Sequence, residues 1–386
     1  MRKVAIIGAG QSPFGELWDL SFRDIFLSAG VEVLEDSGLE GKEIEAMYVG
    51  NMSGGRYLAQ EHIAALIADY SGMAELNIPS TRVEAADASG GLALRQAYMS
   101  VASGVHDIAI AAGVEKVTDV GSDMAMNILS SSADREWEGF VGATVPSLYG
   151  MMARMHMEKY ATTSEDLAAI SVKNHKNATL NPKAQFKREI SLEAALKSPF
   201  VSEPLRLFDC APASDGASVV ILADEETARK YTDNPVFISA SCQASDYLAL
   251  QSRKDTLTMD AVAHAARKAY EQAGVEPKAI DVAEVHDSFT IAELMAYEDL
   301  GFVEKGEGKK LIREGTTSID GEIPINTSGG LKACGHAYGA TGIRQAAEIS
   351  LQLRGDAGRR QIDAEKGLAL NIGGTGATAV VTIFSR

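Results

Sequence analysis

The sequence predicts an α/β protein made of two similar halves, with a helical segment inserted into the first. Two observations carry this prediction: short buried strands alternate with amphipathic helices, and one stretch of the first half recurs in the second. The 386 residues, 46% of them hydrophobic, suffice for two domains of ordinary size. The expected parts are 1–118 with 201–230 (first half), 119–200 (insertion) and 231–386 (second half).

In the first half the alternation of strand and helix is typical of a parallel sheet covered by helices. Helices are expected at Phe22–Ser37 and from Ser89 to about Ser103. The expected strands are Val4–Ile7, Ala46–Val49, Thr81–Ala86, Ile108–Ala112 and Gly216–Leu222. Residues 119–200 interrupt this order, and helical periodicity at Ser147–Tyr160 and Ser164–Asn177 predicts a helical lobe.

The second half repeats the early order, with a helix at Met259–Ala273 and another after Tyr338. Its expected strands are Phe237–Ala240, Val282–Val285, Ala369–Ile372 and Ala377–Phe384. Residues Gly38–Asn51 match Gly274–Asp287 at a constant offset. The tetrapeptide Ser89–Leu92 recurs as Ser328–Leu331. The explanations are a duplicated unit whose equivalent loops face one cleft, or convergence on a common helix–turn–strand pattern.

Composition excludes several classes of function. The net charge of −17 argues against nucleic-acid binding. The same charge repels anionic ligands, so an anionic ligand needs a local basic or backbone site. No apolar run reaches the roughly 20 residues of a membrane span, and no signal peptide is visible. The cysteines, Cys210, Cys242 and Cys334, are too far apart for a zinc site or disulfide framework. We expect a cytoplasmic protein without a metal.

Two glycine motifs offer chemistry at strand ends. Gly8-Ala-Gly10 is a poor dinucleotide fingerprint because Pro13 follows and the third glycine comes late, so we expect a tight turn rather than an NAD-dependent oxidoreductase. Asp87-Ala-Ser-Gly-Gly follows a strand and opens a helix, where backbone N–H groups stabilise negative charge. Asp87 is therefore either an ionised group in a site or a helix N-cap.

Three further loops point to the same cleft. His286 directly follows a buried strand, where ligands of open α/β sheets bind, although a lone His is often structural. The loop Asn326–Gly342 surrounds His336 with small residues, which lets the backbone approach a ligand beside a potential base. Asn371–Gly376 is either a β-turn or an oxyanion site made of backbone N–H groups.

Together these loops, in this order and spacing, resemble the thiolase family, closest to archaeal acetoacetyl-CoA thiolases and the sterol-carrier-protein class. The most specific elements are Gly335-His-Ala-Tyr-Gly-Ala-Thr-Gly342 and Ser214-Asp-Gly-Ala-Ser218. The resemblance covers essentially the whole chain. It implies the thiolase fold: two α/β halves of mixed sheet in a five-layered αβαβα core, with residues 119–200 as the loop domain.

The resemblance also implies an activity and partners. The reaction is Claisen condensation of two acetyl-CoA to acetoacetyl-CoA, or thiolysis with free CoA, feeding hydroxymethylglutaryl-CoA and the mevalonate pathway. The CoA thioester is a substrate, and no cofactor is bound covalently. Implied partners are further copies in a homodimer or homotetramer, hydroxymethylglutaryl-CoA synthase, and a small OB-fold zinc-ribbon protein.

Carried over by position, the resemblance implies that Asp87 replaces the nucleophilic Cys and that His336 is the base that activates this position. It implies that His286 and Gly373 belong to two oxyanion holes, which Asn326 supports. Asn371 and Ser288 replace the acid/base cysteines of two branches of the family, and Cys334 is either an acid/base or a packing residue. Attack by the Asp87 carboxylate on a thioester gives a reactive mixed anhydride, so turnover through an acyl-enzyme is impaired. The alternatives are chemistry without an acyl-enzyme (an aldolase, decarboxylase or acyl-CoA hydrolase) and a non-catalytic CoA-binding scaffold.

Overall fold

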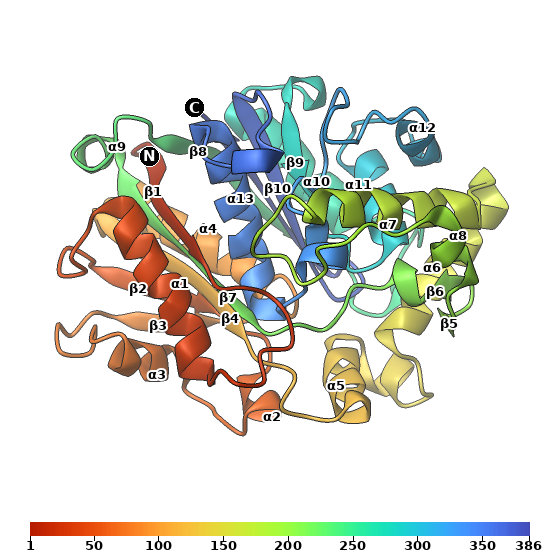
Figure 1. The fold of residues 1–386 in the computed structure, drawn as a ribbon, viewed down its shortest axis with the longest axis horizontal. Coiled ribbons are helices and arrows are strands. Elements are labelled where there is room, and N and C mark those ends of the chain that lie inside the picture. Colours follow the sequence, from red (N-terminus) through yellow and green to blue (C-terminus); the bar gives the residue numbers. More distant parts are fainter.

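The computed structural model describes residues 1–386 and shows the two halves side by side (Figure 1). The first half contains β1 (Val4–Gln11), α1 (Phe22–Ser37), β2 (Ala46–Gly50), α2 (Gly54–Tyr57), α3 (Ile63–Tyr70), β3 (Ser80–Val83), α4 (Ser89–Ala102), β4 (Ile108–Glu115), β7 (Gly216–Asp224) and α9 (Glu225–Ala228). Between β4 and β7 lie α5 (Ser122–Leu129), α6 (Val145–Tyr160), α7 (Ser164–Ala178), α8 (Leu192–Lys197), β5 (Phe200–Ser202) and β6 (Leu205–Arg206). The second half contains β8 (Val236–Ser245), α10 (Asp260–Ala273), β9 (Val282–Glu284), α11 (Thr290–Asp299), α12 (Gly308–Arg313), α13 (Thr341–Arg354), β10 (Lys366–Gly373) and β11 (Thr378–Ser385).

One nine-stranded sheet runs through both halves in the order β3-β2-β4-β7-β1-β8-β11-β10-β9. The halves join where β1 pairs with β8. Strand β2 is parallel to β3 and β4, and β9 is parallel to β10, but the other neighbours are antiparallel. The parallel sheet expected from the alternation in the first half holds for β2, β3 and β4 only, because β7 pairs antiparallel with both β4 and β1. The mixed sheet implied by the resemblance is confirmed.

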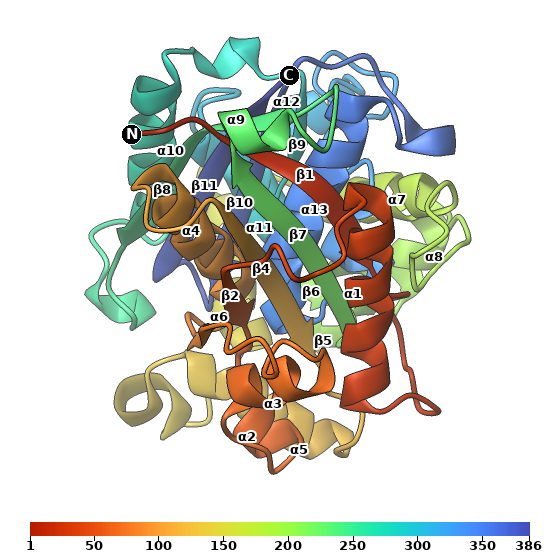
Figure 2. The same cartoon turned by 90° about the vertical axis from the view of Figure 1, so that its left-hand side faces the viewer.

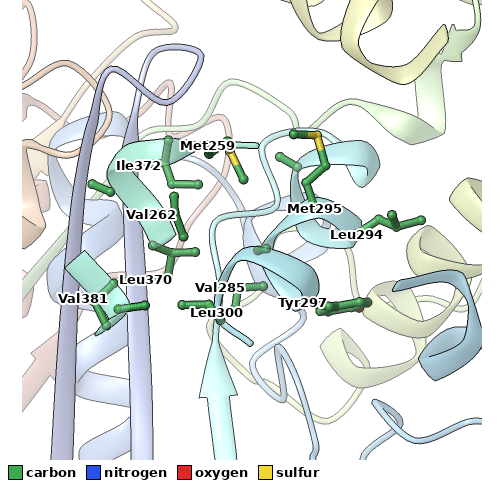
Figure 3. Close-up of a cluster of buried hydrophobic side chains, with 14 of the residues drawn as sticks. Met259, Val262, Val285, Leu294, Met295, Tyr297, Leu300, Leu370, Ile372 and Val381 are labelled. Atoms are coloured by element: carbon green, nitrogen blue, oxygen red, sulfur yellow. The ribbon is translucent and has the colours of Figure 1, made fainter. Parts of the chain in front are cut away.

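Three buried clusters arrange the elements in five layers. One cluster joins α1 and α3 to the first-half strands, and Figure 2 shows α1 lying along β7. A second surrounds α4 and α13 and contacts strands of both halves. The third joins the second-half strands to α10 and α11, where Val262, Leu294 and Ile372 contribute side chains (Figure 3). The αβαβα order is confirmed, with α4 and α13 in its central layer.

One of the two internal matches has a structural counterpart. Gly38 ends α1 and Gly274 ends α10, both in the left-handed conformation, with φ of 70° and 68°. Each is followed by a short connection into a strand, β2 or β9. The second match is wrong: α4 begins at Ser89, whereas Ser328 lies in a loop and α13 begins only at Thr341.

The glycines of Gly8-Ala-Gly10 lie inside β1 and not in a turn, so that expectation is wrong. A Cβ at Gly10 would lie 2.3 Å from the carbonyl oxygen of Ala29 on α1. The missing side chains let α1 pack closely on the strand. The motif therefore serves helix–strand packing.

Two further differences from the expected elements concern a strand and a helix. The strand expected at Thr81–Ala86 ends at Val83, before a bend. Helix α11 was not predicted, because all its residues are buried and it lacks an amphipathic pattern. Helices α6 and α7 of the inserted segment pack against α11. No helix combines the length and apolar character needed to cross a membrane.

Candidate active site

Asp87 lies on a sharp bend between β3 and α4. Ala86 has a φ of 51°, in the left-handed region that residues with a Cβ rarely adopt. Ser89 holds the bend, since its Oγ donates to the Ala86 carbonyl (2.5 Å) and accepts from the Ala85 N–H (3.0 Å). The N-cap of α4 is Ala88, without a side-chain cap. The alternative of Asp87 as the capping residue is therefore wrong; its side chain is buried in the interior.

The carboxylate of Asp87 is paired with His336. Oδ2 lies 3.3 Å from His336 Nε2. On the other side of the ring, Nδ1 lies 2.8 Å from Thr341 Oγ1, whose hydroxyl donates to the Ala337 carbonyl. The hydroxyl therefore accepts from Nδ1–H, and Nε2 must donate to an ionised carboxylate, which only accepts. This geometry fits an imidazolium–carboxylate pair.

The surroundings favour an ionised Asp87. Burial by itself raises the pKa of this carboxyl, but the hydrogen bond and the charge of His336 outweigh burial and bring the pKa below its ordinary value. The Gly374 N–H also approaches Oδ1, at 3.4 Å. Asp87 is therefore an anion at neutral pH, and a weak nucleophile.

His286 presents an N–H group to the same space. Its Nδ1 accepts from the side-chain amide of Asn371 (3.1 Å) and from the Ile372 N–H (3.3 Å). The orientation of the Asn371 amide is set by Gly91, whose N–H donates to Oδ1 at 2.9 Å. The proton of the ring is thus on Nε2, which has no hydrogen-bond partner and lies 3.9 Å from Asp87 Oδ2. Burial lowers the pKa of His286 to about 3, so the ring is neutral.

The three groups form a compact cluster whose nearest nitrogen and oxygen atoms lie within 4.8 Å of one another. Two imidazoles and a carboxylate are a ligand set that divalent cations accept. A cation needs a lone pair from each ring, however, and His286 Nε2 carries a proton here. The N–H donors of this cluster therefore suit an oxygen atom that gains negative charge, and they suit a metal ion less well.

Asn371 ties the cluster together. Its Nδ2 donates to the Asp87 carbonyl at 3.0 Å as well as to His286. Gly373, two residues farther along β10, stays the predicted oxyanion residue. The backbone amide that approaches the Asp87 carboxylate is that of Gly374. A Cβ at Gly373 would lie 2.5 Å from the Ala85 carbonyl, so this glycine allows β10 to approach the bend.

Three other predicted residues stand around the cluster. Ser288 is buried, and its Oγ has no partner. Asn326 braces the loop from behind, because its Oδ1 accepts from the Val285 N–H and its Nδ2 donates to Glu293. Cys334 lies in a separate small apolar cluster, and burial raises the pKa of its thiol to about 11. None of these three side chains is hydrogen-bonded to Asp87.

Sequence reasoning missed several residues at the site. Thr341 sets the ring orientation of His336, and the signal for it was a hydroxyl at the start of the following helix. The Tyr338 ring packs edge-on against His336, with centroids 4.7 Å apart. Glu115, at the buried end of β4, accepts from the N–H groups of Met52 and Gly339, and burial raises its pKa to about 7. It anchors the loop that carries His336.

Comparisons with known proteins agree with this architecture. Residues 4–226 match the model "Thiolase, N-terminal domain" and residues 242–386 match "Thiolase C-terminal domain-like". An acetyl-CoA acetyltransferase of Methanothermobacter thermautotrophicus is 57% identical, with 100% of both chains covered. Sterol carrier protein 2 of Homo sapiens is 33% identical over 100% of this chain and 72% of its own. The solved structure described as the Ltp2-ChsH2(DUF35) aldolase superposes with a TM-score of 0.86 at 26% identity, covering 98% of this chain and 97% of its own.

Proposed function

Because the chain belongs to the thiolase family, we propose that its substrates are CoA thioesters, acetyl-CoA and acetoacetyl-CoA in particular. The relative from Methanothermobacter thermautotrophicus, named acetyl-CoA acetyltransferase, supports this substrate class. The overall reaction is the Claisen condensation or its reverse, thiolysis, and its product feeds hydroxymethylglutaryl-CoA and the mevalonate pathway. The protein works in the cytoplasm.

The observation that carries the chemistry is the unpaired N–H of His286 beside the Asp87 carboxylate. A thioester carbonyl oxygen placed there accepts from His286 Nε2. The carboxylate then removes a proton from the α-carbon, and the electron pair of the broken C–H bond becomes the enolate. Because the pKa of Asp87 is low, this base is weak and the step is slow.

Acyl transfer onto residue 87 is the step that this site performs poorly. Attack by the carboxylate on the thioester carbon expels CoA as its thiolate and leaves a mixed anhydride, which water hydrolyses. A Cys at this position forms a stable thioester instead. The chain therefore retains the enolate half of the family reaction and is impaired in the acyl-enzyme half.

Aldol cleavage is a second candidate, favoured by the carboxylate and by the likeness to the structure described as an aldolase. In this reaction Asp87 accepts the proton of a β-hydroxyl group, the bond between the α- and β-carbons breaks, and the electron pair forms an enolate held by His286. No covalent intermediate on residue 87 is needed.

The proposed assembly is a homodimer or homotetramer that associates with hydroxymethylglutaryl-CoA synthase and a small OB-fold zinc-ribbon protein. The name of the Ltp2-ChsH2(DUF35) aldolase joins two components, which supports a partner of that kind. Size-exclusion chromatography with light scattering, alone and with the candidate partners, tests both statements.

The test of the proposed chemistry is hydrogen–deuterium exchange into the methyl group of acetyl-CoA, with intact mass of the protein as a second readout. We expect the wild-type chain to exchange slowly and to carry no acetyl adduct. Asp87→Asn should lose exchange, and Asp87→Cys should gain an acetyl adduct and release CoA. A stable acetyl adduct on the wild type would refute the proposal.

The same variants separate the alternatives. Cleavage of a β-hydroxyacyl-CoA to acetyl-CoA and an aldehyde, lost in Asp87→Asn, establishes aldol chemistry. If CoA thioesters bind by calorimetry while no variant exchanges, cleaves or condenses, the chain is a scaffold that holds CoA.

A further inference from the structure

A cavity of about 660 Å³ lies away from Asp87, between α7, the segment that follows it and the loop 207–212. Its apolar walls are Phe186, Ile190, Leu207, Phe208 and Pro212. Its charged residues are all cations: Lys187, Arg188 and Lys332. Neither Asp87 nor His286 nor His336 lines it.

Lys332 is a buried cation without a salt bridge. The residue is 3% exposed, and its ammonium has one hydrogen-bond partner, the Cys210 carbonyl at 2.6 Å. The Phe208 ring centroid lies 5.7 Å from Nζ. An ammonium carries three donor hydrogens, so two of them lack a partner from the chain. Buried charges in proteins are normally paired, which makes this one exceptional.

His175 adds an unused acceptor to the same cavity. Its ring lies between Phe186 and Phe208, 5.7 Å from each ring centroid. Nδ1 lies 3.3 Å from the Arg188 carbonyl oxygen, which only accepts, so the ring proton is on Nδ1. Nε2 therefore carries a lone pair, and this buried atom has no partner.

The lining of this cavity is positively charged, although the whole chain is acidic. The protein has 53 acidic and 36 basic residues, yet no Asp or Glu lines this cavity. Aromatic and aliphatic walls suit an apolar body, and the cations suit a negative group. The unmet donors of Lys332 and the unmet acceptor of His175 define two polar contacts for one ligand.

We propose that this cavity is a binding site for a small organic anion that has an apolar body and one O–H or N–H group. The anionic group accepts from Lys332, the O–H or N–H donates to His175, and the body lies against Phe186 and Phe208. This proposal is independent of the chemistry at Asp87.

The site shares its back wall with the catalytic loops. The Lys332 N–H donates to Asp287, the neighbour of His286, and the Ala211 N–H donates to the Ser288 carbonyl. The cavity residue Gln185 accepts from Ser214, whose Oγ accepts from the His336 N–H. A ligand here therefore contacts the same framework that positions both histidines.

The test uses two fluorescent probes with the same aromatic body: anilinonaphthalenesulfonate, which has a sulfonate and an N–H, and phenylnaphthylamine, which lacks the sulfonate. We expect the full-length protein to bind one equivalent of the sulfonate probe saturably. Lys332→Met should weaken that binding by at least about tenfold, the value of one charge-assisted hydrogen bond, and leave the neutral probe unaffected.

A second pair of variants covers the case in which Lys332→Met fails to fold. Leu207→Glu places a carboxylate at the exposed rim of the cavity and should also weaken the sulfonate probe selectively. Leu192→Glu, also exposed but outside the lining, is the matched control and should bind like the wild type. Equal affinity for both probes, or equal loss in Leu207→Glu and Leu192→Glu, would overturn the proposal.

Discussion

Asp87 and Lys332 are two buried charged residues with opposite surroundings: Asp87 is paired with a histidine, and Lys332 has no salt-bridge partner. Asp87 has an imidazole 3.3 Å away, whereas the Lys332 ammonium contacts a backbone carbonyl and an aromatic ring and makes no salt bridge. The charges of Asp287 and Asp209 also act on Lys332, but burial outweighs them. Both pKa values are below their ordinary range, but the meaning differs. For Asp87 the lowered pKa means that the site stabilises the charge, and for Lys332 a pKa of about 8 means that burial penalises it.

The difference indicates which of the two buried charges the chain stabilises with its own residues. The anion at residue 87 is already balanced by the His336 imidazole. Lys332 makes no salt bridge, whereas the other two buried lysines are paired, Lys116 with Asp215 and Lys173 with Glu293. Three substitutions test this contrast.

Removing the partner of Asp87 should have the largest effect. His336→Leu leaves a buried carboxylate unpaired, so we expect the free energy of unfolding at pH 7 to fall by about 3–5 kcal/mol. Denaturation in guanidinium chloride measures this change. In Asp87→Asn/His336→Leu, where no charge remains, most of the loss should disappear. Equal losses in the single and double variants would show that Asp87 does not depend on this pairing.

Removing the charge of Lys332 should have the opposite sign. Its folded pKa of about 8 is below the unfolded value of 10.5, so its cost is fully present below pH 8 and vanishes as the pH rises through 10.5. Lys332→Met should therefore stabilise the protein at pH 7 by up to about 3 kcal/mol, less the lost hydrogen bond.

The pH dependence and a matched lysine provide the controls. The gain in Lys332→Met should shrink between pH 8 and pH 10.5 in guanidinium denaturation. Lys173→Met should destabilise instead, because it strands Glu293, which lies 2.9 Å from the Lys173 ammonium. Destabilisation of both variants alike would remove the distinction between the two lysines.

The smallest effect is expected from the residue that orients His336. Thr341→Val keeps the shape but removes the acceptor of Nδ1–H, leaving a buried donor unpaired at a cost of about 1–3 kcal/mol. Nitrogen NMR of the imidazole should report a changed environment at Nδ1. Thr290→Val, which removes a buried hydroxyl bonded to Asp209, is the control and should leave the His336 signals unchanged.

The residues that surround Asp87 were predictable because each has a local signal. His286 follows a buried strand, His336 lies in a glycine-rich loop and Asn371 lies close to the end of β10. The hydrogen-bond pattern was not predictable, since the choice between the amides of Gly373 and Gly374 depends on the exact bend of the backbone. The same holds for the ring orientation that Thr341 imposes.

The fold, too, was predictable where the sequence carries a local pattern and not where it lacks one. Amphipathic helices such as α1 and α10 were predictable from their periodicity, whereas α11 is buried on all sides and has none. A lysine within a polar loop is expected to be exposed, so Lys332 gave no sign of its burial. That burial arises from Cys210 and Phe208, which are distant in the chain.

The bend at Ala86 determines how easily the side chain at residue 87 can be exchanged. The backbone, held by Ser89, aims residue 87 at the two imidazoles whatever its side chain is. The reactive atom at this position is thus replaceable without rebuilding the frame around it. A change of the side chain at residue 87 therefore exchanges the reactive group, while the surrounding frame still presents the same N–H groups to it.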